Sequence, residues 1–200
     1  MTDDSWTGGG AAALKTYAPD VLRSYDVLVS VRPSGVHDEM LESPAVAAFA
    51  EQFGADSSIE AAVLTAFVEE TGAHATAVTR MVWIADVAPR VRAALDAVFG
   101  PTETWPGRRR YPVADTGVAV EDFLESVDRL VAAEPDGSSR RPDAAGAALG
   151  LADAMARNPT AIPEPVVEAV HELLTPVEAV EVVLGSARRS ADKLSAVLVA

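Results

Sequence analysis

The sequence contains two similar ten-residue stretches, DVLRSYDVLV at residues 20–29 and DFLESVDRLV at residues 122–131. Six of the ten aligned positions are identical, and the same alignment pairs Pro33 with Pro135 and Gly35 with Gly137. Weaker matches continue to the end of the chain after a one-residue insertion. A similarity at a fixed, long spacing indicates a tandem duplication. The alternative is that two alanine-rich amphipathic halves match through composition alone.

The repeated stretch has the period of an α-helix, because Val21, Tyr25 and Leu28 fall on one helical face. A capping box at 175–178, with proline at the first helical position, predicts the start of another helix. The second half is expected to form helices over 118–132, 144–156 and 165–174, and from 175 onward. No window alternates polar and apolar β-branched residues as a strand does. The sequence therefore predicts an all-α protein.

Four segments are expected along the chain. Residues 1–17 contain three consecutive glycines and little that could anchor them, which predicts a partly flexible lead. Helical repeats then follow over 18–100 and 120–200, joined by a linker over 101–119. Each half alone would have a marginal core, so we expect one compact helical bundle with its halves related by a pseudo-two-fold axis. Alanine stripes at 45–50 and 144–148 permit close helix approach, which suits this packing or a homodimer.

Charge and composition exclude several classes of function. The chain has 200 residues, of which 30 are acidic and 16 basic, giving a net charge of −14. Such a protein is a poor ligand for nucleic acid or anionic membranes, which require cationic surface. The sequence has neither a membrane-length apolar run nor a secretory signal, and the absence of cysteine excludes disulfides and thiolate chemistry. We expect a cytoplasmic protein, and fourteen arginines against two lysines, with abundant alanine, suggest a bacterial source.

Two pairs of segments resemble a known family. Residues 45–53 with 83–96 are similar to the C-terminal helices of carboxymuconolactone decarboxylase-like (alkylhydroperoxidase D-like) proteins. Residues 148–155, with 175–184 and Lys193, resemble the same helices again. The redox members of that family carry a Cys-x-x-Cys pair with a nearby histidine, and this chain has no cysteine, so it cannot be a thiol peroxidase. The decarboxylase branch works without a metal or organic cofactor, so the resemblance implies none here.

The candidate site residues cluster in the first repeat. Arg80 and Trp83 share a helix face, and Asp86 follows near the end of that helix. In a pocket, Arg80 and Trp83 would bind an anionic small molecule, and His74 or Asp86 would act as the catalytic group that moves a proton. The alternative is that Trp83 packs between the repeats while Arg80 and Asp86 form an ion pair.

Two further features have a structural and a functional interpretation. Arg109 lies within the basic run 108–110, which could hold an anionic ligand or could fix the linker against acidic faces of the same chain. The three histidines, His37, His74 and His171, show no metal-ligand spacing. No metal site is therefore expected, and His171 is interpreted as a helix-surface or core-edge side chain.

The sequence leaves two functions open. The favoured one is a redox-inactive alkylhydroperoxidase D-like helical protein that serves as an interaction or small-molecule-binding module, either as a single chain or as a homo-oligomer. The alternative is a cofactor-independent enzyme that performs decarboxylase, isomerase or lyase chemistry on an anionic organic metabolite.

Overall fold

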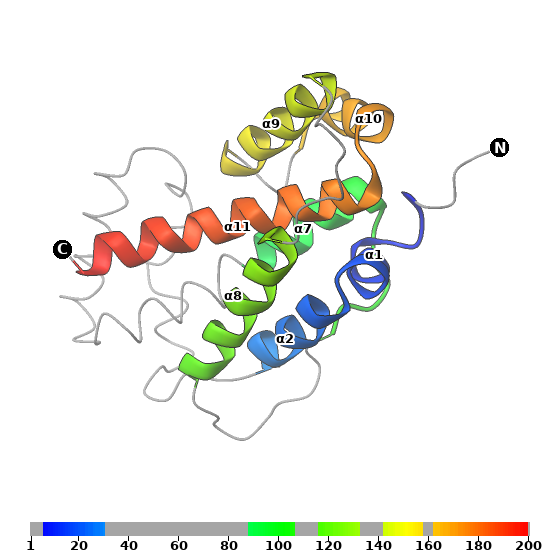
Figure 1. The fold of residues 1–200 in the computed structure, drawn as a ribbon. Helices are drawn as coiled ribbons and strands as arrows, with labels where there is room; N and C mark the ends of the chain where they lie inside the picture. The colour runs from blue at the N-terminus through cyan, green and yellow to red at the C-terminus, as the bar shows by residue number, and fades with distance from the viewer. Residues whose placement is uncertain (1–5, 31–87, 107–115, 133–141, 158–161, 200) are drawn as a thin grey trace, which may run out of the picture.

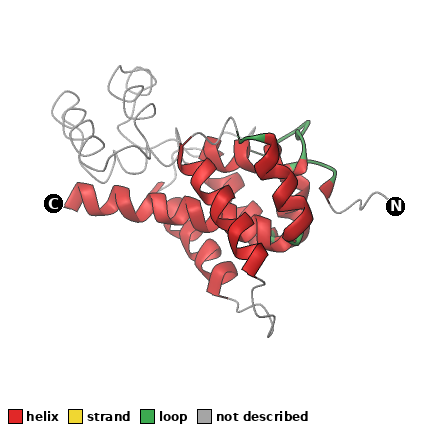
Figure 2. Ribbon diagram, turned by 90° about the horizontal axis from the view of Figure 1, so that it is seen from above, coloured by secondary structure: helices red, strands yellow, loops and turns green. Residues whose placement is uncertain are grey.

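A computed structural model describes residues 6–30, 88–106, 116–132, 142–157 and 162–199 of the chain. Within these ranges the structure consists of helices and loops, without strands (Figure 2). The all-α prediction is therefore confirmed for these ranges. The helices are α1 (Gly10–Tyr17), α2 (Pro19–Ser30), α7 (Ala88–Phe99), α8 (Thr116–Ala132), α9 (Pro142–Arg157), α10 (Glu164–Leu173) and α11 (Pro176–Val199).

Helix α11 organises the described helices. It crosses between α9 and α10 on one side and α8, α2 and α1 on the other, with α7 against its first half (Figure 1). The buried face of this half presents Ala179, Val180, Val183 and Leu184 to the core. The distal half of α11 extends toward the C-terminus, away from the other helices described (Figure 2).

Helices α2 and α8, which carry the two similar stretches, lie side by side and run in opposite directions (Figure 1). The apolar face predicted for α2 is confirmed, since Val21, Tyr25 and Leu28 are all buried. Phe123 of α8 packs against the Tyr25 ring at a centroid distance of 6.2 Å. At the centre of this contact the Ser24 and Ser126 hydroxyls are hydrogen-bonded at 2.7 Å.

The segment predicted as a flexible lead contains a packed helix. Residues 10–17 form α1, and its Leu14 side chain is fully buried. The anchors come from distant parts of the chain: Gly9 N–H donates to the Phe99 carbonyl at 3.1 Å, and Ala11 N–H donates to Thr102 Oγ1 at 3.1 Å. These anchors are not apparent from residues 1–17 alone, because the partners lie some ninety positions further along the chain.

The helices of the second half agree with the sequence prediction within a few residues. The capping box at the start of α11 is formed: Thr175 N–H donates to Glu178 Oε2 at 2.7 Å, and Glu178 N–H donates to Thr175 Oγ1 at 3.3 Å. These signals act within one turn of helix, so they are readable without knowledge of the tertiary structure. The helix expected to carry Arg80, Trp83 and Asp86 lies outside the described residues.

Candidate functional site

The sequence-predicted site lies outside the part of the chain that the structure describes. His74, Arg80, Trp83 and Asp86 fall within residues 31–87, and Arg109 falls within 107–115. The structure therefore does not test whether these residues form one site. The enzymatic alternative that depends on them stays a prediction.

The described helices form an apolar surface groove where α9, α11 and the end of α8 meet. Its volume is about 350 Å³. Most of the lining side chains are small or aliphatic, and the charged ones are few: Val131, Ala144, Ala145, Ala148, Leu149, Ala152, Leu174, Glu178, Glu181, Val182, Gly185, Ser186 and Arg189. Alanines recurring every three or four residues place their methyl groups on one face of α9, so the groove is shallow and smooth on that side.

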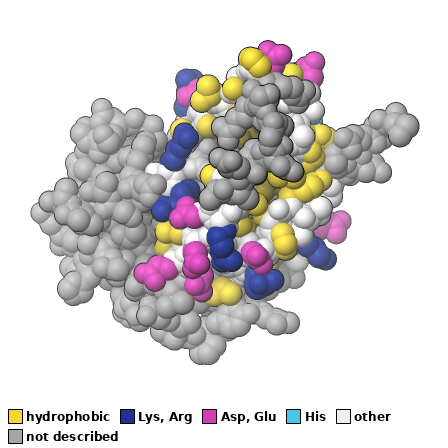
Figure 3. Space-filling view, viewed as in Figure 1, with side chains coloured by type: hydrophobic (Ala, Val, Ile, Leu, Met, Phe, Trp, Pro, Cys, Tyr) yellow, Lys and Arg dark blue, Asp and Glu magenta, His cyan; other side chains and the backbone are white. Residues whose placement is uncertain are grey.

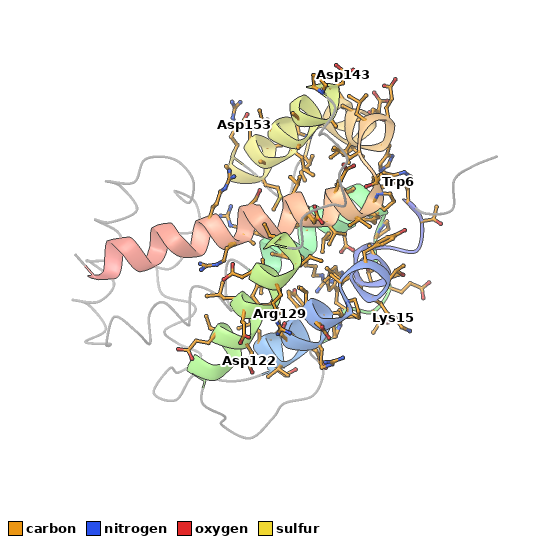
Figure 4. All side chains as sticks on the ribbon, viewed as in Figure 1. Trp6, Lys15, Asp122, Arg129, Asp143 and Asp153 are labelled. Atoms are coloured by element: carbon orange, nitrogen blue, oxygen red, sulfur yellow. The ribbon has the colours of Figure 1, made fainter. Side chains whose placement is uncertain are left out.

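Two side chains at this groove leave apolar surface in water. Leu149 of α9 is 68% exposed and Val131 of α8 is 49% exposed. A single exposed leucine is ordinary on a protein surface, whereas exposed side chains grouped around a concave apolar surface indicate a binding site. Hydrophobic side chains are visible on the upper part of the molecule, where α9 lies, among acidic and basic side chains (Figure 3). Asp143 and Asp153 mark the two ends of α9 in Figure 4.

The charges along the groove are separated by sign. Glu178 and Glu181 line it near the start of α11, and Arg189 lines it two turns further along. The Glu178 carboxylate is already engaged in the helix cap, where it also accepts from Thr175 Oγ1 at 2.9 Å. The groove is therefore acidic at one end and basic at the other, with an apolar centre.

A second concentration of polar groups surrounds Asp96 of α7. Its carboxylate accepts from Trp105 Nε1 at 2.9 Å, from Thr102 Oγ1 at 2.8 Å and from the Thr102 backbone N–H at 3.1 Å. The Arg92 guanidinium lies above the Trp105 ring, 5.8 Å from its centroid. These bonds occupy the carboxylate with groups of the chain itself, so Asp96 serves to join α1, α7 and the loop 100–106.

Aromatic side chains at the C-terminal end of α7 also connect segments that are distant in the sequence. Trp6 stacks on Phe99 at 5.3 Å and contacts the His171 ring at 4.5 Å. His171 Nε2–H donates to the Val98 carbonyl at 2.7 Å, which pairs an otherwise open carbonyl at the end of α7. The His171 side chain is exposed to solvent while its ring bonds the edge of α7, which agrees with its interpretation as a helix-surface or core-edge side chain. Figure 4 shows Trp6 at the junction of α1, α7 and α10, and an open hollow of about 1100 Å³ lies beside it.

Tyr25 is a buried titratable group with a structural partner. Its side chain is 3% exposed, and its hydroxyl donates to the Ala88 carbonyl at 3.0 Å. Burial raises the pKa of the Tyr25 phenol well above its ordinary value of 10.0, and the nearby Arg92 only partly opposes this effect. The phenol is therefore neutral at physiological pH and links α2 to the start of α7.

The described residues contain neither a metal-binding cluster nor a membrane-spanning helix. Within these ranges no three His, Asp or Glu side chains are grouped closely enough to hold a metal ion. None of the described helices is both long and apolar enough to cross a membrane. Of the two hollows above, the apolar groove is the better candidate site, because exposed apolar side chains border it.

Comparison of the chain with protein-family models, with curated proteins and with solved structures gives no match. The resemblance to alkylhydroperoxidase D-like proteins accordingly depends on the sequence segments alone.

Sequence reasoning identified only part of the groove. The stripe 144–148 was recognised as suited to close helix approach, and it does line one wall. Leu149, Val131 and Arg189 were missed because each lies on a different helix or face, and only the packing of α8, α9 and α11 brings them together. A signal was present in α9, where Leu149 continues the alanine face at a position that the core does not bury.

Proposed function

We propose that this chain is a helical interaction module without redox activity, an internally duplicated relative of the alkylhydroperoxidase D-like proteins. Its groove between α9 and α11 docks an amphipathic helix. The observation that carries this proposal is the exposure of Leu149 and Val131 beside an apolar groove whose two ends have opposite charge. The complementary partner helix has an apolar stripe, with a basic residue opposite Glu181 and an acidic residue opposite Arg189.

The contact between Ser24 and Ser126 supports the duplication. The two serines are equivalent in the alignment of the two similar stretches, and they are 102 positions apart. In an arrangement with a two-fold axis, equivalent residues lie at equal distances from the axis, so they touch only where the axis passes between them. The antiparallel packing of α2 on α8, centred on this pair, is what a pseudo-two-fold relation between the repeats requires.

A helix fits this site better than a small molecule does. Small-molecule sites are concave and cover most of the ligand, whereas this groove is open along α9 and α11 and is bordered by a protruding leucine. A helix laid along it would cover both exposed side chains and reach both charged ends, which lie two turns apart on α11.

The absence of cysteine allows a direct test. A Leu149→Cys variant labelled with an environment-sensitive fluorophore reports on the groove, and a labelled Val177→Cys variant is the control, since Val177 is exposed on α11 outside the lining set. The probes are synthetic amphipathic helices with complementary and with reversed terminal charges. We expect a saturable blue shift at position 149 with the complementary peptide, a weaker one with the reversed peptide, and none at position 177.

Two outcomes would overturn the proposal. One is that the fluorescence at position 149 shows no saturable change, either when the peptides are added or when the protein itself is concentrated. The other is an equal response at positions 149 and 177. The second control is Ala148→Glu in the labelled background, which places a charge in the groove and is expected to abolish the response.

A further inference from the structure

The charge pattern of the groove on α11 is complementary to itself. Glu181, Gly185 and Arg189 all line the groove, and their spacing of four residues places them along one face of the helix. Gly185 is midway between the acidic and the basic residue. If a second α11 crosses the first in the opposite direction over Gly185, Glu181 of each copy faces Arg189 of the other, and both contacts are attractive.

The centre of this pattern, Gly185, has room for a larger side chain, as Gly146 and Gly150 of α9 also do. A Cβ atom built on Gly185 would have no atom within 4 Å to contact. Alanine would therefore fit there, and it would favour the helix more than glycine does in the middle of a long α-helix. The described residues that pack on α11 therefore leave room for alanine at position 185, and a small residue at that position allows a second helix to cross closely.

The same two-fold operation also covers the exposed apolar side chains. Helices α9 and α11 line the groove together, so a two-fold axis in the contact plane, perpendicular to α11, brings α9 beside its own copy. Leu149, near the middle of α9, then lies close to its equivalent, and its exposed surface is removed from water. A two-fold contact of this kind uses one patch twice, which is the commonest arrangement in homodimers.

We propose that the groove is the interface of a symmetric homodimer in which α11 crosses α11 antiparallel at Gly185, with reciprocal Glu181–Arg189 pairs. This inference rests on the proposed function, since it identifies the docked helix as that of a second copy. Among the described residues, two exposed large apolar side chains, Leu149 and Val131, border the groove, whereas the interface of a stable dimer buries about 800 Å² on each partner. The association is therefore weak and depends on concentration.

A charge-swap experiment tests the proposal. Arg189→Glu places two Glu–Glu contacts in the dimer, and Glu181→Arg places two Arg–Arg contacts. Each single variant is expected to raise the dimer dissociation constant at least tenfold, as measured by analytical ultracentrifugation over a range of concentrations. In an equimolar mixture of the two variants both contacts become attractive again, so a heterodimer of near wild-type affinity is expected. The double variant is expected to dimerise by itself.

Matched controls separate this specific effect from a change in net charge. Arg23→Glu and Glu125→Arg change the charge equally, on exposed side chains of α2 and α8 outside the groove. They are expected to leave dimerisation unchanged. Dimerisation that is equally weakened by the controls, or that the mixture fails to restore, would contradict the reciprocal pairing.

Cross-linking gives an independent readout. In the cysteine-free chain, Leu149→Cys under mild oxidation is expected to give a covalent dimer, while Val177→Cys remains monomeric. Monomeric wild-type protein at all concentrations, with no cross-link at 149, would overturn the dimer. If the complementary peptide still bound the labelled groove in that case, the interaction module would stand without self-association.

Discussion

Asp96 shows how one carboxylate organises three segments of the chain. Its two oxygens accept bonds from Trp105 and Thr102, and Gly10 N–H approaches Oδ1 at 3.4 Å. The side chain therefore holds the start of α1 and the loop 100–106 against α7. Hydrogen bonds to a charged group are stronger than neutral ones, so its removal leaves several donors without their acceptor.

We expect Asp96→Ala to lower the free energy of unfolding by about 2–3 kcal/mol, since a hydrogen bond to a charged group contributes about that much. Asp96→Asn is expected to lie between the wild type and the alanine variant, because the amide keeps one acceptor oxygen. Urea denaturation followed by tryptophan fluorescence measures both. Asp20→Ala is the control, because its ion pair with Arg23 is exposed and contributes little. Equal losses in Asp96→Ala and Asp20→Ala would contradict the joining role.

Tyr25 makes stability dependent on pH at the alkaline end. The pKa of its phenol is raised by burial, so the folded chain keeps a proton that the unfolded chain releases near its ordinary pKa of 10.0. This contribution to stability is complete below pH 10. Above pH 10 it falls by up to about 1.4 kcal/mol per pH unit, until the pH reaches the folded-state pKa.

We expect Tyr25→Phe to lose about 1 kcal/mol at pH 7, because the Ala88 carbonyl loses its donor. The same variant is expected to lose less stability than the wild type between pH 10 and 11. Guanidinium titrations at pH 7, 10 and 11 measure both effects. The control Tyr17→Phe also removes one phenol but keeps Tyr25, so it should retain the wild-type alkaline loss. An identical loss of stability between pH 10 and 11 in Tyr25→Phe and the wild type would refute the assignment.

For single helices, the sequence predicts an element correctly when the contacts that fix it lie close by in the chain. Helices α8 to α11 were predicted within a few residues because their caps, prolines and apolar faces are local signals. Helix α1 was missed because Asp96 and Thr102 bond the N–H groups at its start from a distant part of the chain. The walls of the groove were missed for the same reason, since they come from three helices.

Two glycines inside the described helices are expected to change the stability of the fold in opposite directions when each is replaced by alanine. A Cβ on Gly10 would approach the Leu95 side chain at 2.6 Å and the Leu95 backbone carbon at 2.9 Å, whereas a Cβ on Gly146 would meet nothing within 4 Å. We expect Gly10→Ala to destabilise the fold by about 1–3 kcal/mol through overpacking. Gly146→Ala should stabilise α9 by about 0.5–1 kcal/mol through helix propensity. Thermal unfolding of both variants is the measurement, and a stabilised Gly10→Ala would show that α1 is not held this closely to α7.

For the whole molecule the dominant long-range effect is the net charge of −14. Exposed pairs such as Arg157 with Asp153, at 2.8 Å, offset only a little of the repulsion among the excess carboxylates. Salt screens that repulsion, since the Debye length falls to about 10 Å at 0.1 M. The melting temperature is therefore expected to rise by several degrees between 10 and 300 mM NaCl, in proportion to the excess charge. Calorimetry at one protein concentration measures this, with choline chloride as the control for specific sodium binding; a fall in the melting temperature would contradict it.

The burial of Leu14 also has a consequence for how the protein is made. Helix α1 is covered by α2, α7 and α11, and α11 leaves the ribosome after the other described helices. During synthesis the apolar face of α1 therefore remains exposed until the first half of α11 has been translated. Nascent chains expose such surfaces to chaperones and to one another. We expect α1 to become resistant to protease only after residues 176–190 have left the ribosome, and chains stalled before residue 176 to be sensitive to protease at their N-terminal end.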